Sequence, residues 1–304
     1  MSIFDQLVKK NLIKNYTGFI KNNVQYEIMM GSVAYGVSSD ESDIDIYGFC
    51  IPPKNIIFPH LSGEIYGFGS QTQRFEQFQE HHIKDEQARK EYDITIYSIV
   101  KYFQLCMQNN PNMIDSLFVP RRCILHSTRV GEHVRENRKL FLHKGSWFKF
   151  KGYAYSQLHK MNIKQPEEDS TRYEMVQKFG YDLKFAYHIV RLLNEIEQIL
   201  IEHDLDLERN REQLKSIRRG EWNEKQIIDY FHEKEKQLEK IYSESTLQHS
   251  PDEEKIKSLL INCLEMHYGS LSDAIKINVS VEKMLDSMEQ SIQKLRYELN
   301  RVAK

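Results

Sequence analysis

The chain has 304 residues, of which 40% are hydrophobic and 28% are charged, and its formal net charge is −2. That length accommodates one large domain or two smaller ones, with enough apolar residues for a core. The balanced charge excludes a strongly basic or acidic protein whose overall charge would select its partners. No run approaches the roughly 20 apolar residues of a membrane span, so we expect no membrane insertion.

The cysteines and the first residues indicate a compartment. Four cysteines stand alone without CxxC spacing, which fits a reducing environment and argues against a structural zinc site. Residues 1–16 are amphipathic and contain an acid, without the continuous apolar core of a signal peptide. We therefore expect a soluble cytoplasmic protein.

The first predicted elements are a helix over residues 3–22 and a buried strand over residues 26–30. Gly31 and Ser32 then break the strand and open a short helical turn. A hydroxyl and free backbone N–H groups at such a turn suit phosphate oxygens, and glycine allows close backbone approach. Gly31 and Ser32 are therefore candidate phosphate-binding residues.

The next strand carries two acids. Successive strand side chains point to opposite faces, so Asp43 and Asp45 share one face while Ile44 and Ile46 fill the other. Two carboxylates on one face repel each other unless a cation lies between them. The pair indicates either a metal site or a solvated acidic edge strand, and the Gly-Ser turn before it favours the metal site.

The remaining elements of the first part are strands near 75–83, 91–97 and 123–125 and helices over 98–108 and 113–118. In the strand at 91–97, Asp93 shares a face with Thr95 and Tyr97. His81 and His82 could suggest a metal site with Asp85. Adjacent histidines point to opposite sides of a strand, however, so the structural interpretation is favoured.

From Thr128 onward helical patterns dominate, and local positive charge appears. Residues 121–151 contain nine Lys or Arg against Glu132 and Glu136, which fits either a solvated surface or a binding surface for a triphosphate or polynucleotide. Lys184, His188 and Arg191 share one helix face, again as a solvated stripe or a binding site. The predicted helices cover 128–137, 147–161, 171–202, 210–217, 223–244, 252–267 and 279–302.

The last of these helices, over residues 279–302, has apolar residues in alternating steps of four and three. This is a stripe of about three heptads. It predicts either packing on the chain's own helical part or a coiled coil with a second copy or another partner, and the sequence does not separate these.

Together, Gly31-Ser32 and Asp43-Ile44-Asp45 resemble the DNA polymerase β superfamily of nucleotidyltransferases. Further blocks, from about residue 25 to about residue 270, are similar to predicted nucleotidyltransferases found beside RNA ligases. These blocks are 91–97, 110–112, 114–118 and 180–184. The resemblance implies an α+β fold: a polymerase-β-like core with a mixed sheet over 1–125, a helical nucleotide- or acceptor-binding domain over 126–270, and a C-terminal amphipathic helix in 271–304.

The resemblance also implies the chemistry. Two Mg²⁺ (or Mn²⁺) ions would be held by Asp43 and Asp45 as shared ligands and by Asp93 on the side of the attacking hydroxyl. Gly31 and Ser32 would hold the β and γ phosphates. The implied triphosphate- or acceptor-binding residues are Lys184, His188, Arg191 and Arg218.

The function implied is template-independent transfer of a nucleotide from an NTP or dNTP to a hydroxyl. The expected acceptor is an RNA or DNA 3′ end or a growing oligonucleotide. Alternatives are a hydroxyl of a partner protein, as in antitoxin-type relatives, a small molecule, or a non-catalytic nucleotide-binding scaffold. The presence of Asp43, Asp45 and Asp93 argues against the scaffold.

Overall fold

The computed structural model describes residues 1–38, 44–58, 74–163, 171–269 and 292. Residues Met1–Cys263 form one compact unit and Leu264–Lys304 form a second. The domain boundaries that the sequence predicts, at 125 and 270, stay predictions. Of the C-terminal helix predicted over 279–302, all residues except Ile292 lie outside the described residues.

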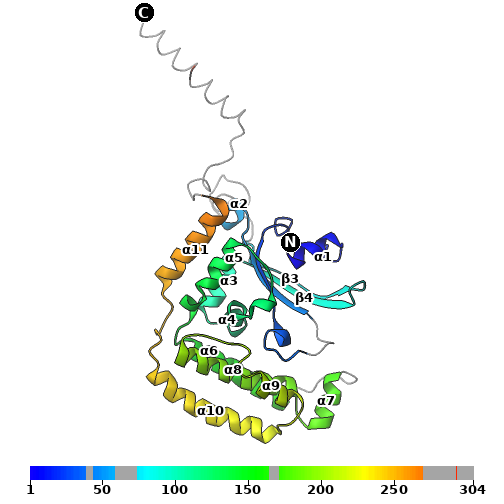
Figure 1. Ribbon diagram of the computed structural model, residues 1–304, viewed down its shortest axis with the longest axis vertical. Helices are drawn as coiled ribbons and strands as arrows, with labels where there is room; N and C mark the ends of the chain where they lie inside the picture. The colour runs from blue at the N-terminus through cyan, green and yellow to red at the C-terminus, as the bar shows by residue number, and fades with distance from the viewer. Residues whose placement is uncertain (39–43, 59–73, 164–170, 270–291, 293–304) are drawn as a thin grey trace, which may run out of the picture. The chain divides into compact units, whose positions relative to one another are not determined.

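The first unit contains a five-stranded mixed sheet in the order β3-β4-β2-β1-β5. Strands β2 and β4 are parallel, and the other neighbouring pairs are antiparallel. The predicted α+β class with a mixed sheet is confirmed. The strands, shown in Figure 1, are β1 (Val24–Met29), β2 (Ile44–Cys50), β3 (Gln77–Asp85), β4 (Lys90–Ser98) and β5 (Ile124–Ser127).

The alternation of side chains in β2 and β4 gives the sheet one apolar face. Ile46, Ile94 and Ile96 pack in one cluster with Phe4 and Leu7 of the N-terminal helix. Burial of each such side chain contributes roughly 1.5–3 kcal/mol. Because this face is filled, the acids of β2 and β4 are left on the opposite face.

The N-terminal helix α1 covers only Ile3–Lys9, so the prediction of a helix over 3–22 is wrong beyond its first part. Asn11 has a φ of 60°, a left-handed conformation that ends the helix. Ile13 and Ile20 are nonetheless buried. Their spacing reflects packing of an irregular segment under the sheet rather than a helical period.

Helices α3 (Ile99–Met107) and α4 (Pro111–Phe118) lie on the side of the acids. Helix α3 begins within one residue of the predicted start, whereas α4 begins two residues before the predicted 113. Ser98 caps α3 and Asn110 caps α4, each by accepting a hydrogen bond from a backbone N–H. Phe49 of β2 contacts Tyr102 of α3, with ring centroids 4.9 Å apart. These helices therefore cover one end of the acid-bearing face.

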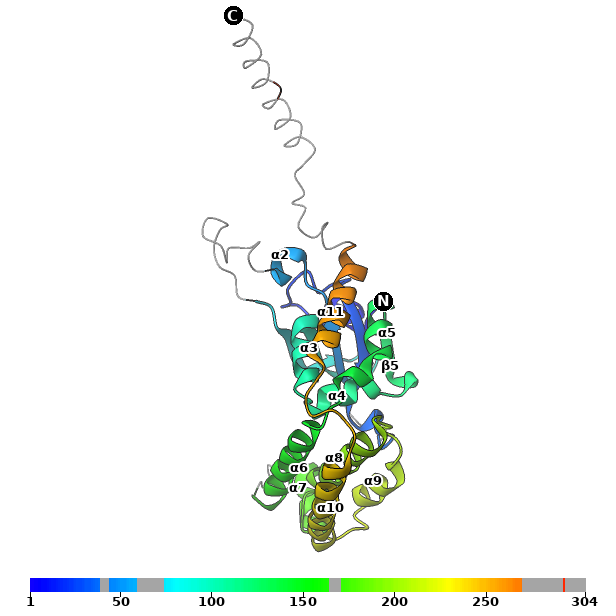
Figure 2. The same ribbon diagram turned by 90° about the vertical axis from the view of Figure 1, so that its left-hand side faces the viewer.

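The later helices pack mainly on one another. Helix α8 contacts α6 and α10, and Figures 1 and 2 show these helices grouped together beyond α4. The other elements are α2 (Lys54–Ile57), α5 (Arg129–Glu136), α6 (Ser146–Ile163), α7 (Thr171–Phe179), α8 (Leu183–Glu202), α9 (Arg211–Arg218), α10 (Glu224–Glu244), α11 (Glu253–Tyr268), and the 3₁₀ turns η1 (Gly31–Val33), η3 (Arg121–Cys123) and η4 (Arg138–Phe141).

The helix predicted over 171–202 is two helices. Gly180 has a φ of +83°, which ends α7, and Asp182 then caps α8 by accepting from the N–H groups of Lys184 and Phe185. Within the described residues no helix is long and apolar enough to cross a membrane.

Candidate active site

The turn after β1 and the acidic strand β2 are in direct contact. We call residues 31–37 the Gly-Ser loop. A β-carbon built on Gly31, whose φ is +66°, would lie 2.2 Å from Oδ2 of Asp45. The N–H of Met30 also donates to the Asp45 carbonyl at 2.7 Å. A larger residue here would have to displace the Asp45 carboxylate and adopt a strained backbone conformation, so the predicted phosphate turn and the predicted metal-ligand strand meet in one site.

The acids of β2 and β4 lie side by side. Asp45 pairs directly with Asp93 in the parallel register of the two strands, and neighbouring strands are about 4.8 Å apart. Both carboxylates belong to the face opposite the apolar cluster. Asp43, the remaining predicted acid, lies outside the described residues. The structure therefore brings two of the three predicted acids together beside Gly31.

A bulge in β3 directs two further groups at Asp93. The β3–β4 register shifts between Glu80 and Ile83, and His82 has a φ of 56°. The His82 N–H donates to Asp93 Oδ1 at 2.8 Å, and His81 Nδ1 lies 3.1 Å from Asp93 Oδ2. Strand alternation predicts opposite directions for the two histidines and misses this bulge.

These contacts influence the charge of Asp93. Partial burial would raise the pKa of its carboxyl, but the hydrogen bonds from the His82 amide and the His81 ring outweigh that effect. The pKa consequently lies below its usual value. Asp93 is therefore ionised at neutral pH, as a cation ligand must be.

The acids fit a hard divalent cation. Mg²⁺ binds through one or two carboxylates completed by water and substrate phosphates rather than in an all-protein cage. Asp45 and Asp93 supply two carboxylates beside a turn suited to phosphate. Among the described residues no group of three or more His, Cys, Asp or Glu is arranged to hold a metal, and Asp43 is not among them.

The predicted binding residues of the helical part take different places. Lys184 is exposed near the start of α8, and His188 is half-buried, with its ring 4.1 Å from that of Tyr187. Arg191 is only 4% exposed and contacts Asp115, Glu195 and Tyr35. Arg218 donates to the carbonyl of Val37 in the Gly-Ser loop. In the structure, the guanidinium groups of Arg191 and Arg218 therefore donate hydrogen bonds to acceptors within the protein.

Aromatic side chains stand on the same sheet face as the acids. Tyr47 and Tyr97 contact edge to face, with centroids 6.3 Å apart. Burial, followed by the nearby Tyr97, Asp45, Asp93 and Tyr153, raises the pKa of Tyr47 to about 12. Strand alternation from Asp45 could have identified Tyr47, whereas the approach of Tyr153 on α6 required the tertiary structure.

Comparisons with known proteins identify a family. The model of the RNA repair pathway DNA polymerase beta family matches residues 4–262. No curated protein matches the chain. Among solved structures, a nucleotidyltransferase-like protein from Exiguobacterium sibiricum aligns at 10% identity and a TM-score of 0.29, covering 89% of this chain and 77% of that one.

Proposed function

The chain belongs to the RNA repair pathway DNA polymerase beta family, and we propose that it transfers a nucleotide from an NTP or dNTP to a hydroxyl acceptor. Membership of this polymerase-β-like nucleotidyltransferase family supports nucleotidyl transfer. The observation that carries the proposal is the arrangement of Gly31, Asp45 and Asp93: the turn at Gly31 lies against Asp45, which pairs with Asp93 in the neighbouring strand.

The carboxylates supply the electrostatic part of the proposed mechanism. Nucleotidyl transfer needs in-line positioning and neutralisation of charge on the phosphates. Asp45 and Asp93, with Asp43, would hold Mg²⁺ or Mn²⁺, which supplies Lewis-acid stabilisation and makes the acceptor hydroxyl more acidic. Asp93, fixed by His81 and His82, is proposed to act on the side of the attacking hydroxyl.

The Gly-Ser loop is proposed to hold the β and γ phosphates, through backbone N–H groups at Gly31 and the hydroxyl of Ser32. Lys184 is exposed and remains a proposed ligand of the triphosphate or acceptor, as does His188. For Arg191 and Arg218 we propose an indirect role, because their guanidinium groups contact the loop itself.

A nucleic-acid 3′ end or a growing oligonucleotide is the proposed acceptor. Tyr153 is 39% exposed and its hydroxyl accepts from Asn110 Nδ2 at 3.1 Å, which leaves an aromatic ring near the site on which a base could stack. The lysine- and arginine-rich residues 121–151 offer less unpaired positive charge than their sequence alone indicates. Ion pairs within the chain engage four of these residues: Arg121, Arg122, Lys139 and Lys151.

The test is label transfer from each α-phosphate-labelled NTP and dNTP with Mg²⁺ or Mn²⁺, first without acceptor and then with RNA and DNA oligonucleotides. Oligonucleotides that end in 3′-OH should be extended, and matched ones that end in 3′-deoxy should not. Label that appears only in protein would favour a protein hydroxyl as acceptor. Absence of transfer in every arm would overturn the proposal.

Association through 279–302 and a cytoplasmic location stay predictions.

A further inference from the structure

The Gly-Ser loop is held from outside the sheet, by residues that follow it by about 80 residues or more in the chain. Its innermost anchor is Tyr35, which is 2% exposed. The Tyr35 hydroxyl donates to Asp115 Oδ2 of α4 at 2.7 Å and accepts from Arg191 Nη1 of α8, also at 2.7 Å. The Arg191 guanidinium carbon lies 4.3 Å from the centroid of the Tyr35 ring. The loop, α4 and α8 thus meet at one phenol.

Arg191 is the shared cation of this cluster. It donates to Asp115 and, at 3.0 Å, to Glu195 Oε1, and all three side chains are nearly inaccessible to solvent. Burial raises the pKa of both carboxyls, and the Arg191 charge opposes that rise. Buried ion clusters are poor sources of stability compared with apolar packing, and their best-attested use is to fix one arrangement.

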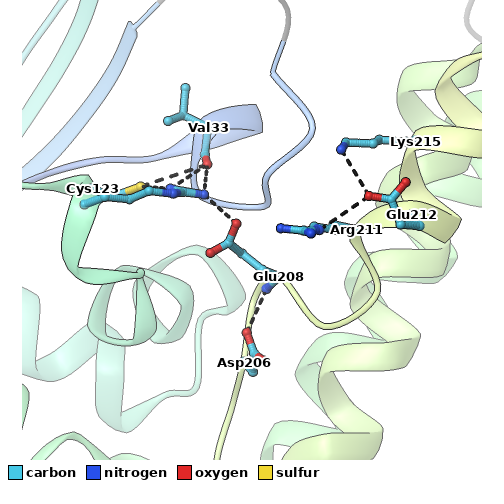
Figure 3. Close-up of polar contacts among 8 residues, drawn as sticks. Val33, Cys123, Asp206, Glu208, Arg211, Glu212 and Lys215 are labelled. Atoms are coloured by element: carbon cyan, nitrogen blue, oxygen red, sulfur yellow. Dashed lines mark hydrogen bonds and ion pairs between the residues drawn. The ribbon is translucent and has the colours of Figure 1, made fainter.

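Outer contacts hold the rest of the loop. Arg122 donates to the Val33 carbonyl at 3.3 Å and pairs with Glu208 at 2.6 Å. Figure 3 shows the Glu208 carboxylate pointing toward the loop at Val33, where it forms its ion pair with Arg122. A β-carbon on Gly36, whose φ is +67°, would lie 2.8 Å from Glu208 Oε1. Arg218 donates to the Val37 carbonyl. The loop therefore has anchors at Val33, Tyr35 and Val37.

From this geometry we propose that Tyr35 and Arg191 are positioning residues. Through their hydrogen bond, the helical part holds the Gly-Ser loop in place against Asp45, and the position of the loop in turn determines the affinity for a nucleoside triphosphate. The inference rests on the proposed function. Arg191 is separated from solvent by its own partners, so its effect on the nucleotide passes through Tyr35 rather than through contact with phosphate.

The test compares Tyr35→Phe with Tyr230→Phe. The first removes only the hydroxyl between Arg191 and Asp115. The second removes a phenol hydrogen bond away from the loop, from the half-buried Tyr230 of α10 to Asn194 Oδ1 of α8 at 2.6 Å. We expect the Kd of a fluorescent ATP analogue to rise at least about tenfold in Tyr35→Phe alone, because the substitution removes both hydrogen bonds of the Tyr35 hydroxyl and the loss of a single buried one corresponds to about tenfold. KM for the triphosphate should follow, with kcat changed less.

Hydrogen exchange of a peptide spanning 31–37, measured without nucleotide, separates this inference from the proposed function. Exchange should be faster in Tyr35→Phe than in wild type and unchanged in Tyr230→Phe. Arg191→Lys keeps the charge but not the planar fork and should reproduce the effect. Unchanged loop exchange and nucleotide affinity in Tyr35→Phe would overturn the inference. Faster loop exchange in Tyr35→Phe, together with a wild-type protein that binds no triphosphate, would support the positioning of the loop and overturn the proposed function instead.

Discussion

A β-carbon on Gly31 would lie 2.2 Å from Oδ2 of Asp45, so the absence of a side chain at Gly31 lets the Asp45 carboxylate lie directly against the turn. Gly31 follows β1, and Asp45 lies in the antiparallel neighbour β2. In the proposed site, this contact would determine how far a phosphate bound at the turn lies from the carboxylate. The catalytic geometry we propose therefore depends on a backbone position as well as on the acids.

Gly31→Ala should reduce transfer about 100-fold, the effect of misplacing reacting groups by about 1 Å. The new methyl group must displace the Asp45 carboxylate, and a φ of +66° also strains alanine. Gly18→Ala is the matched control, because a β-carbon there meets nothing within 4 Å. Activity is measured by label transfer, with circular dichroism to confirm folding. Equal activity in the two folded variants would contradict the proposed contact.

Asp45→Asn should abolish transfer in a folded protein, because it removes a charged ligand on which the proposed metal site depends.

Asp93→Asn should lower the single-turnover rate more than the nucleotide affinity, because the proposed role of Asp93 concerns the attacking hydroxyl. Nucleotide binding and single-turnover rate are measured separately. A loss of affinity with an unchanged rate at saturation would give Asp93 another role.

His81→Ala should weaken the apparent affinity for Mg²⁺ or Mn²⁺ by about tenfold, as loss of a group that orients a metal ligand does. The His81 ring contacts the Asp93 carboxylate, whereas the His82 ring contacts Glu91 Oε1 at 2.6 Å. His82→Ala keeps the backbone N–H that donates to Asp93 and should have the smaller effect. Divalent-cation titrations of activity and calorimetry check this. Equal effects of the two substitutions would count against the ring contact.

Glu27 should make stability depend on pH. It is fully buried and accepts from the Phe4 N–H at 2.9 Å, and burial raises the pKa of its carboxyl from 4.5 to about 7. Between these values the folded state holds a proton that the unfolded state releases, so stability falls as pH rises through this window. At 1.36 kcal/mol per unit, the fall is about 3 kcal/mol.

The variant that isolates this effect is Glu27→Gln, which cannot ionise. Its free energy of unfolding in urea should fall less than that of wild type between pH 5 and pH 8, by an amount approaching the value given above. Glu233→Gln, at an exposed position on α10, should follow wild type. Parallel pH curves for wild type and Glu27→Gln would show that Glu27 ionises normally in the folded protein.

Several features were determined by the sequence alone, because they depend on local geometry. Strand alternation predicts that Asp45 and Ile46 point to opposite faces of the sheet, as do Asp93 and Ile94. In the structure, Ile46 and Ile94 lie in the core. The Gly-Ser break formed η1. Ser98 capped α3. Each of these outcomes follows from the period of a strand or the hydrogen-bonding needs of a helix end.

Only the tertiary structure decided which groups meet across the chain. Arg191 has the helical spacing of a solvated or ligand-binding stripe, but the packing of α8 beside α4 and the Gly-Ser loop gave it Asp115 and Tyr35 as partners. The bulge at His82 turned His81 toward Asp93. Periodicity fixes the face on which a side chain lies, whereas its partner depends on long-range packing and register, which no local pattern records.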